Sequence, residues 1–122
     1  MKRSAGLLTL AVLLRAGAVS GAEMDADTLL HIYDTGTREQ KTAIEEMVLT
    51  AESAFREASS TIVIQRNEFG LYCPENFSAS HLIEMIRHQV MQAKFIGKYP
   101  FETSLLHALQ KEFPPPCSPQ LK

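Results

Sequence analysis

Residues 78–95 read SASHLIEMIRHQVMQAKF, and this stretch decides the fold. Its apolar side chains recur every three or four positions, so they form one stripe when the stretch is wound as an α-helix. Serine is a preferred N-cap residue, and a glycine at position 97 is typical of a helix end. We therefore expect a helix from Ser78 or Ser80 to about Phe95. Its core face should consist of Leu82, Ile83, Ile86, Val90 and Ala93.

Three further segments carry the same period. A short helix is expected over residues 27–34, with Asp25 or Asp27 as its N-cap and Gly36 after its end. A second should span residues 37–58, because Thr37 and Gln40 have the spacing of a capping box. A last helix should span residues 101–113, where the three prolines that follow end it.

Residues 61–64 are β-branched and interrupt this pattern. They indicate either an extended connector or a continuation of the preceding helix, and a lone strand would have no partner. The sequence therefore predicts a small, single-domain, all-α bundle of about four helices with one disulfide. The side chains expected in its core are Ile44, Val48, Phe55, Leu82, Ile86, Val90, Leu105 and Leu109.

The N-terminus has the three parts of a secretory signal peptide. Lys2 and Arg3 precede a nine-residue apolar run, and Ser20 and Ala22 are the small residues before a cut at position 23. We expect residues 1–22 to be a signal peptide and residues 23–122 a single periplasmic domain. A bilayer needs about 20 apolar residues, so no membrane insertion of the mature chain is expected.

The charge of the mature chain bears on its partners. Three of the 12 basic residues and none of the 14 acidic residues lie in the first 22 positions, so the remainder has a net charge of −5. Nucleic-acid binding is disfavoured, because neutralising phosphates requires a basic surface. A net negative domain points weakly to a basic protein partner.

Two cysteines, Cys73 and Cys117, are the whole complement. An even number in an exported protein predicts a disulfide, here closing a loop of about 44 residues. The loop-entropy estimate for such a loop is about 4 kcal/mol. A reactive or metal-binding thiol is the alternative, but neither cysteine has a second one two residues away.

Enzyme motifs are missing from the sequence, including the nucleophile elbow, the phosphate-binding loops and the zinc-protease pattern. We therefore expect no catalytic residues, no cofactor and no metal. His81, Glu84 and His88 share one face of the predicted third helix, opposite its core face. Such a cluster could ligate zinc, but it lacks a fourth ligand, and a solvated polar face is the simpler interpretation.

The same outward side holds apolar residues. Met91 and Phe95 lie beside His88 on the helical wheel, and Tyr99 and Phe101 flank the turn that follows. Aromatic anchors of this kind concentrate binding energy at protein interfaces. We expect these five residues to form a partner-binding or self-association surface, unless another helix of the domain, such as the short first one, covers it.

One resemblance covers residues 72–117. The order is Tyr72-Cys73-Pro74, a serine-capped helix, Tyr99-Pro100, and a last helix that runs through Ala108-Leu109 to Phe113-Pro114 and Cys117. This order resembles the Rap/Tai family of type VI secretion immunity proteins. Membership would imply a helical periplasmic protein, with dimers among its best-known relatives, that occludes the cleft of an injected cell-wall amidase. An acid-stress chaperone of the HdeA type is the alternative, because carboxylates and four histidines would become more positive in acid.

Overall fold

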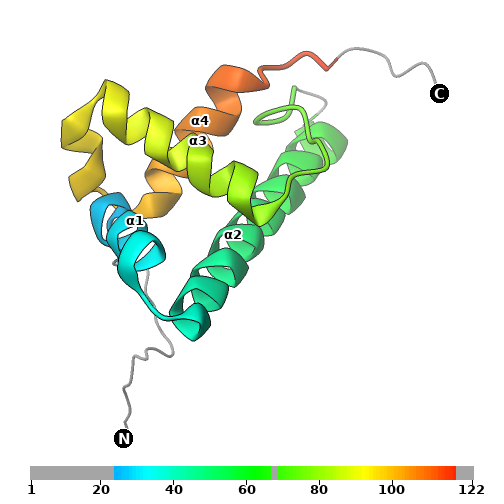
Figure 1. Ribbon diagram of the computed structural model, residues 1–122. Helices are drawn as coiled ribbons and strands as arrows, with labels where there is room; N and C mark the ends of the chain where they lie inside the picture. The colour runs from blue at the N-terminus through cyan, green and yellow to red at the C-terminus, as the bar shows by residue number, and fades with distance from the viewer. Residues whose placement is uncertain (1–23, 67–68, 118–122) are drawn as a thin grey trace, which may run out of the picture.

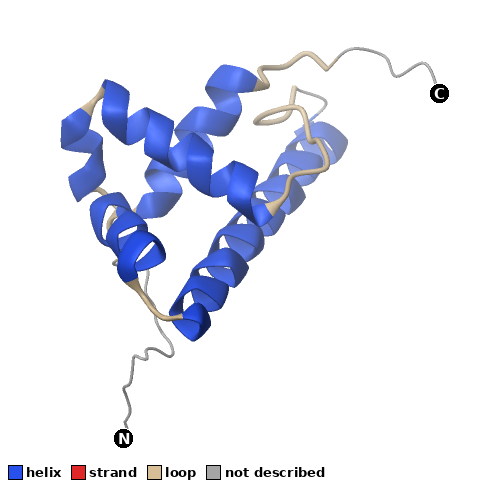
Figure 2. Cartoon of the chain, viewed as in Figure 1, coloured by secondary structure: helices blue, strands red, loops and turns tan. Residues whose placement is uncertain are grey.

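The computed structural model describes residues 24–66 and 69–117, and the predicted signal peptide lies outside them. Within these residues the elements are α1 (Ala26–Thr35), α2 (Arg38–Arg66), α3 (Ala79–Gln92), the 3₁₀ helix η2 (Lys94–Lys98) and α4 (Phe101–Glu112). Figure 1 shows them as a single helical assembly, and Figure 2 draws no strand in the described part. The predicted all-α class with four α-helices and one disulfide is confirmed.

The helix starts follow the predicted capping. The Asp25 carboxylate accepts a hydrogen bond from the backbone N–H of Thr28, at 2.7 Å, and Ser78 caps α3 in the same way through the N–H of His81. Thr37 and Gln40 exchange the two bonds of a capping box, at 2.8 and 3.1 Å. These local bonds satisfy N–H groups that a helix start otherwise leaves without partners.

The core lies around α3, which packs against α1, α2, η2 and α4 (Figure 1). Six of the eight side chains predicted to be buried are buried, while Phe55 and Val90 are half-buried against the core. Two buried residues of α3, Met85 and Gln89, were not predicted. They lie at one edge of the predicted core stripe, so the buried arc is wider than that stripe because three α-helices contact this one.

Two boundaries differ from the prediction. The β-branched residues 61–64 are helical, so of the two interpretations left open for them the continuation of the preceding helix is confirmed, and α2 runs to Arg66 instead of ending near residue 58. The second difference is the end of α3, which lies at Gln92 and not near Phe95. Ala93 is extended (φ −142°), and η2 begins at Lys94. Both differences concern helix ends, where local preference is weak and tertiary contacts decide.

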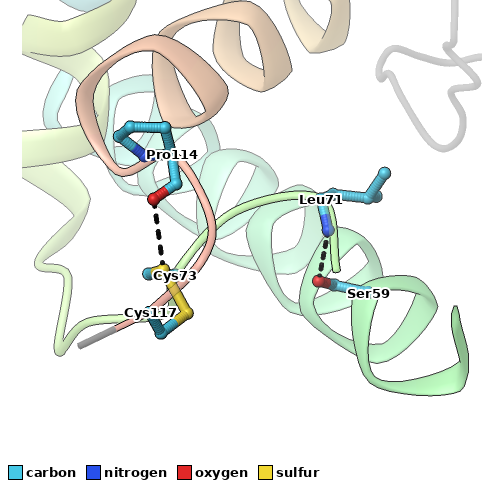
Figure 3. Close-up of a disulfide and its surroundings, with 5 residues drawn as sticks. All are labelled: Ser59, Leu71, Cys73, Pro114 and Cys117. Atoms are coloured by element: carbon cyan, nitrogen blue, oxygen red, sulfur yellow. Dashed lines mark hydrogen bonds between the residues drawn. A yellow bond between two sulfur atoms is a disulfide. The ribbon is translucent and has the colours of Figure 1, made fainter. Parts of the chain in front are cut away.

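The predicted disulfide joins Cys73 to Cys117, with 5.3 Å between the Cα atoms (Figure 3). It ties the loop before α3 to the residues after α4. The backbone N–H of Cys73 also donates to the carbonyl oxygen of Phe113, at 2.7 Å. The carbonyl oxygen of Pro114 lies 3.4 Å from the sulfur of Cys73, a contact rather than a hydrogen bond because a disulfide sulfur carries no proton.

Candidate functional site: an exposed aromatic platform

Three large apolar side chains stand on the surface where α3 passes through η2 to α4. Met91 is 70% exposed, Phe95 68% and Tyr99 51%. The rings of Phe95 and Tyr99 meet edge to face, with centroids 6.2 Å apart and planes at 82°. We call Met91, Phe95 and Tyr99 the aromatic platform. His88, also predicted for this surface, is exposed one turn before Met91 on α3.

Phe101, the fifth predicted partner-binding residue, does not belong to this surface. It is only 3% exposed and forms part of the core. The backbone explains why: the N–H of Phe101 donates to the carbonyl oxygen of Met24, at 3.0 Å, which draws the start of α4 against the segment before α1. A side chain so buried cannot contact a partner in this conformation, so the prediction for Phe101 was wrong.

Backbone bonds hold the platform in place. The N–H of Ala26 donates to the carbonyl oxygen of Tyr99, at 3.0 Å, and the Met24–Phe101 bond lies on the other side of the bridge between Asp25 and Pro100. At the end of η2, the N–H of Tyr99 donates to the carbonyl oxygen of Ile96, at 3.1 Å. The chain that carries the two rings is therefore held at its Tyr99 end by the segment before α1, and the N–H of Ile96 donates to the carbonyl oxygen of Ala93 at its other end, at 2.9 Å. Such restraint lowers the entropic cost of presenting the rings to a partner.

Gly97 allows η2 to lie directly on α1. It is buried, and a Cβ atom at this position would lie 2.2 Å from the nearer carboxylate oxygen of Asp27. The same carboxylate lies 3.6 Å from the ammonium of Lys98. The first helix thus supports the platform from below instead of covering it, which excludes the alternative that it hides Met91 and Phe95.

The polar face of α3 is solvent-exposed at His81, Glu84 and His88. Glu84 lies 3.2 Å from Arg87, whose guanidinium also makes two 2.9 Å hydrogen bonds with Asp34 of α1. The hydrogen bonds from Arg87 hold the pKa of Asp34 below its ordinary value. Among the described residues, no group of three or more histidine, cysteine or acidic side chains could hold a metal ion.

A buried polar cluster lies at the opposite end of the molecule. The hydroxyl of Tyr72 donates to the carboxylate of Glu52, at 2.7 Å, and that carboxylate pairs with Arg56. Burial, followed by the bond to Glu52, raises the pKa of Tyr72 well above its ordinary value. This cluster was not predicted from the sequence, although Glu52 and Arg56 have the i, i+4 spacing of a helical ion pair. Arg56 also donates to the carbonyl oxygen of Glu75, so the cluster anchors the loop before α3.

The loop before α3 approaches α2 closely at a second point. The N–H of Leu71 donates to the buried hydroxyl of Ser59, at 2.7 Å, as Figure 3 shows. At Gly70 a Cβ atom would lie 2.2 Å from that same hydroxyl oxygen. These contacts are structural. Val63, Ile64 and Phe69 near this loop are exposed apolar side chains as well. The aromatic platform is the candidate binding site because its two rings are in contact and its backbone is bonded to the segment before α1.

Comparison with protein-family models, with curated proteins and with solved structures finds no significant match. None of the helices in the described part is long and apolar enough to cross a membrane.

Proposed function

We propose that this chain is a periplasmic immunity protein that binds a peptidoglycan amidase delivered by type VI secretion and occludes its active-site cleft. The observation that carries the proposal is the aromatic platform, an exposed apolar surface on a rigidly held turn. Contiguous apolar patches on a small domain mark contacts with other proteins. The resemblance of residues 72–117 to the Rap/Tai family supplies the kind of partner.

Occlusion requires an element that keeps its shape while it enters a cleft. Phe95 and Tyr99 suit this role because each ring has two rotatable side-chain bonds and the pair is already in contact. The backbone at Tyr99 is held by its bond to Ala26, and Phe95 is held through its ring contact with Tyr99 and by its place in η2. The binding free energy should therefore concentrate in these two rings.

The direct test measures inhibition of a peptidoglycan amidase encoded beside the gene for this chain. Residues 23–122 should inhibit peptidoglycan cleavage, and Phe95→Ala should weaken binding by about 30-fold, the effect of removing an interface hot spot of about 2 kcal/mol. Phe69→Ala is the matched control, because Phe69 is 67% exposed but lies next to α2. Absence of inhibition, or equal effects of the two variants, would contradict the proposal.

Self-association through the same surface is the competing use of the platform, because dimers are expected from the resemblance and a dimer that buried these rings would close them to the amidase. Sedimentation of the wild-type chain and of Tyr99→Ala measures it independently of any toxin. A dimer that Tyr99→Ala dissociates without lowering the melting temperature would place Tyr99 at the interface. A fall of several kcal/mol in folding stability would show that the ring acts in the core instead.

The acid-stress chaperone is the second candidate, and one contact favours it. The Asp34–Arg87 pair joins α1 to α3 and is lost when Asp34 takes up a proton. The pair is partly exposed and contributes less than about 1 kcal/mol, so α1 would be released only if the rising positive charge of the domain in acid destabilised it further. Its release would uncover the apolar surface around Leu29 and Leu30. The wild-type chain should suppress aggregation of client proteins at pH 2–3, and a variant in which α1 is covalently cross-linked to α3 should not. This result would support the chaperone over the immunity protein.

A further inference from the structure

Positive charge gathers beside the aromatic platform although the chain as a whole is acidic. The full chain has a net charge of −2, and residues 23–122 have −5. Residues 85–101 nevertheless contain Arg87, Lys94 and Lys98 and no aspartate or glutamate. The platform therefore lies in a segment whose local charge is opposite to that of the whole domain.

The positions of these groups decide which of them a partner can meet. Arg87 is already paired with Asp34 and Glu84 and lies on the α1 side of α3. Lys94 begins η2 and is exposed. Lys98 ends η2, and its mostly exposed ammonium has Asp27 as a distant ion-pair partner, at 3.6 Å. The two lysines thus bracket Phe95 along the chain and precede Tyr99.

Other charged groups around the platform are few. Asp27 of α1 faces it through Lys98, and Glu102 follows on α4 as a half-buried residue with contacts of its own. Lys111 approaches from the far end of α4, where its ammonium lies 3.4 Å from the side-chain oxygen of Gln92. Asp25 also lies near the platform, since it forms the bridge to Pro100. The acidic groups Asp25, Asp27 and Glu102 are only partly exposed, whereas Lys94 and Lys98 are exposed, so the two lysines are the charged groups most accessible to a partner.

We propose that the aromatic platform binds an acidic protein surface, namely an apolar pocket whose rim carries carboxylates that meet Lys94 and Lys98. In protein interfaces, apolar side chains at the centre supply most of the affinity, and complementary charges at the rim orient the partner and speed association. This inference rests on the proposed function where the partner is the amidase, and it specifies the chemistry of the amidase surface. The net charge of the domain alone favours a basic partner, whereas the local charge at the platform favours an acidic one.

An anionic lipid surface shares the chemistry of a basic rim around aromatic side chains, but the charges argue against it. Each lysine near an anionic bilayer contributes about 1 kcal/mol, and stable anchoring needs several of them or an acyl chain. This surface has two accessible lysines, on a domain that anionic lipid would otherwise repel. A protein pocket can instead bury the rings completely.

The test uses a phage-displayed library of random 12-residue peptides panned against residues 23–122. We expect the selected peptides to combine aspartate or glutamate with aromatic or aliphatic residues. Synthetic versions should bind at least tenfold more weakly to Lys94→Glu/Lys98→Glu and several-fold more weakly when salt is raised from 50 to 300 mM. Phe95→Ala should abolish binding, and Phe69→Ala should leave it unchanged.

Arg38→Glu is the control for charge, because Arg38 is exposed at the start of α2 and one reversal there changes the net charge without touching the platform. It should alter peptide binding by less than twofold. Selection of no peptide, or of peptides without acidic residues, would overturn the inference. So would binding of the wild-type chain, but not the lysine variant, to phosphatidylglycerol vesicles.

The outcomes separate the two proposals. Acidic peptides that bind the platform, on a chain that inhibits no amidase, would support this inference and contradict the immunity function. Amidase inhibition that Lys94→Glu/Lys98→Glu leaves intact would do the reverse. Circular dichroism of the lysine variant checks that it is folded before either result is interpreted.

Discussion

The hydroxyl of Tyr72 is one of the groups that hold the loop before α3 against α2. Tyr72 is almost completely buried, and its hydroxyl donates to the carboxylate of Glu52. Tyr72→Phe keeps the ring but leaves Glu52 with Arg56 as its partner. We expect a loss of about 2 kcal/mol in the free energy of unfolding, the size of a buried hydrogen bond to a charged group. Urea denaturation at pH 7 measures it, and a loss below 0.5 kcal/mol would show that the cluster is solvated.

The ion pair between Asp34 and Arg87 should make the stability of the fold depend on pH. Because Arg87 lowers the folded-state pKa of Asp34, the pair stabilises the fold above the unfolded pKa of aspartate, about 3.9, and this stabilisation is lost as pH falls through the lower folded value. Asp34→Asn should therefore be less stable than wild type at pH 7. Both side chains are partly exposed, so the difference should stay below about 1 kcal/mol.

The comparison that checks it is denaturation of wild type and Asp34→Asn between pH 7 and pH 2. The stability difference should shrink towards zero at the acid end, where Asp34 is protonated and can no longer pair as a carboxylate with Arg87. A difference that is constant with pH would mean that the asparagine is disturbing the helix end and that the ion pair contributes nothing.

At the scale of elements, the end of α2 is the least supported helix segment. Val63 and Ile64 of its last turns are exposed, Ile64 by 78%, whereas Val48 and Ser59 earlier in the helix are buried. Opening of a helix end costs little when few apolar contacts are lost. Amide hydrogens after Ser59 should exchange at least tenfold faster than those from Ile44 to Val48. Equal protection along α2 would indicate that its end packs against something beyond this domain.

The element boundaries also show what the sequence could predict. Capping residues such as Asp25, Thr37 and Ser78 act within one helical turn, so their effect can be read locally. The end of α3 cannot be read in this way. It depends on η2 resting on α1 at Gly97, a contact between segments 70 residues apart along the chain.

The candidate site, like the helix boundaries, could be predicted from the sequence only where it depends on local signals. Met91 lies outside the core because the core stripe of α3 is set by its own helical period. Phe95 is exposed too, but it lies in η2 beyond the end of α3, so the helical period of α3 does not explain its position. The wheel could not place Phe101, whose burial depends on the backbone bond to Met24. The Tyr72–Glu52 cluster was missed for the same physical reason, since it joins a loop to a helix 20 residues earlier.

In the whole molecule, the loop that carries Cys73 leads into the N-terminal end of α3, and η2, which carries Phe95, follows its C-terminal end (Figure 1). The N-terminal end of α3 is reached from the loop that Cys73 and Tyr72 anchor, and its C-terminal end leads into η2. Covalent and buried polar contacts thus restrain one end of the helix, while the other end is restrained by backbone bonds to residues 24–26. Restraint at both ends allows a small core to present exposed aromatic side chains without losing its fold.

Because separate contacts restrain the two ends of α3, the effect of reducing the disulfide can be predicted. A loop of 44 residues closed by Cys73 and Cys117 contributes about 4 kcal/mol at most, so reduction should lower the melting temperature by up to about 30 °C. The Tyr72–Glu52 and Leu71–Ser59 bonds remain, and the reduced chain should keep its helical circular dichroism at 25 °C. Because the platform depends on neither cysteine, a folded Cys73→Ser/Cys117→Ser variant should bind the platform's partner within about threefold of wild type. Melting temperatures that do not respond to reduction would contradict the stabilising role, and loss of binding by a folded variant would show that the two ends of α3 are coupled.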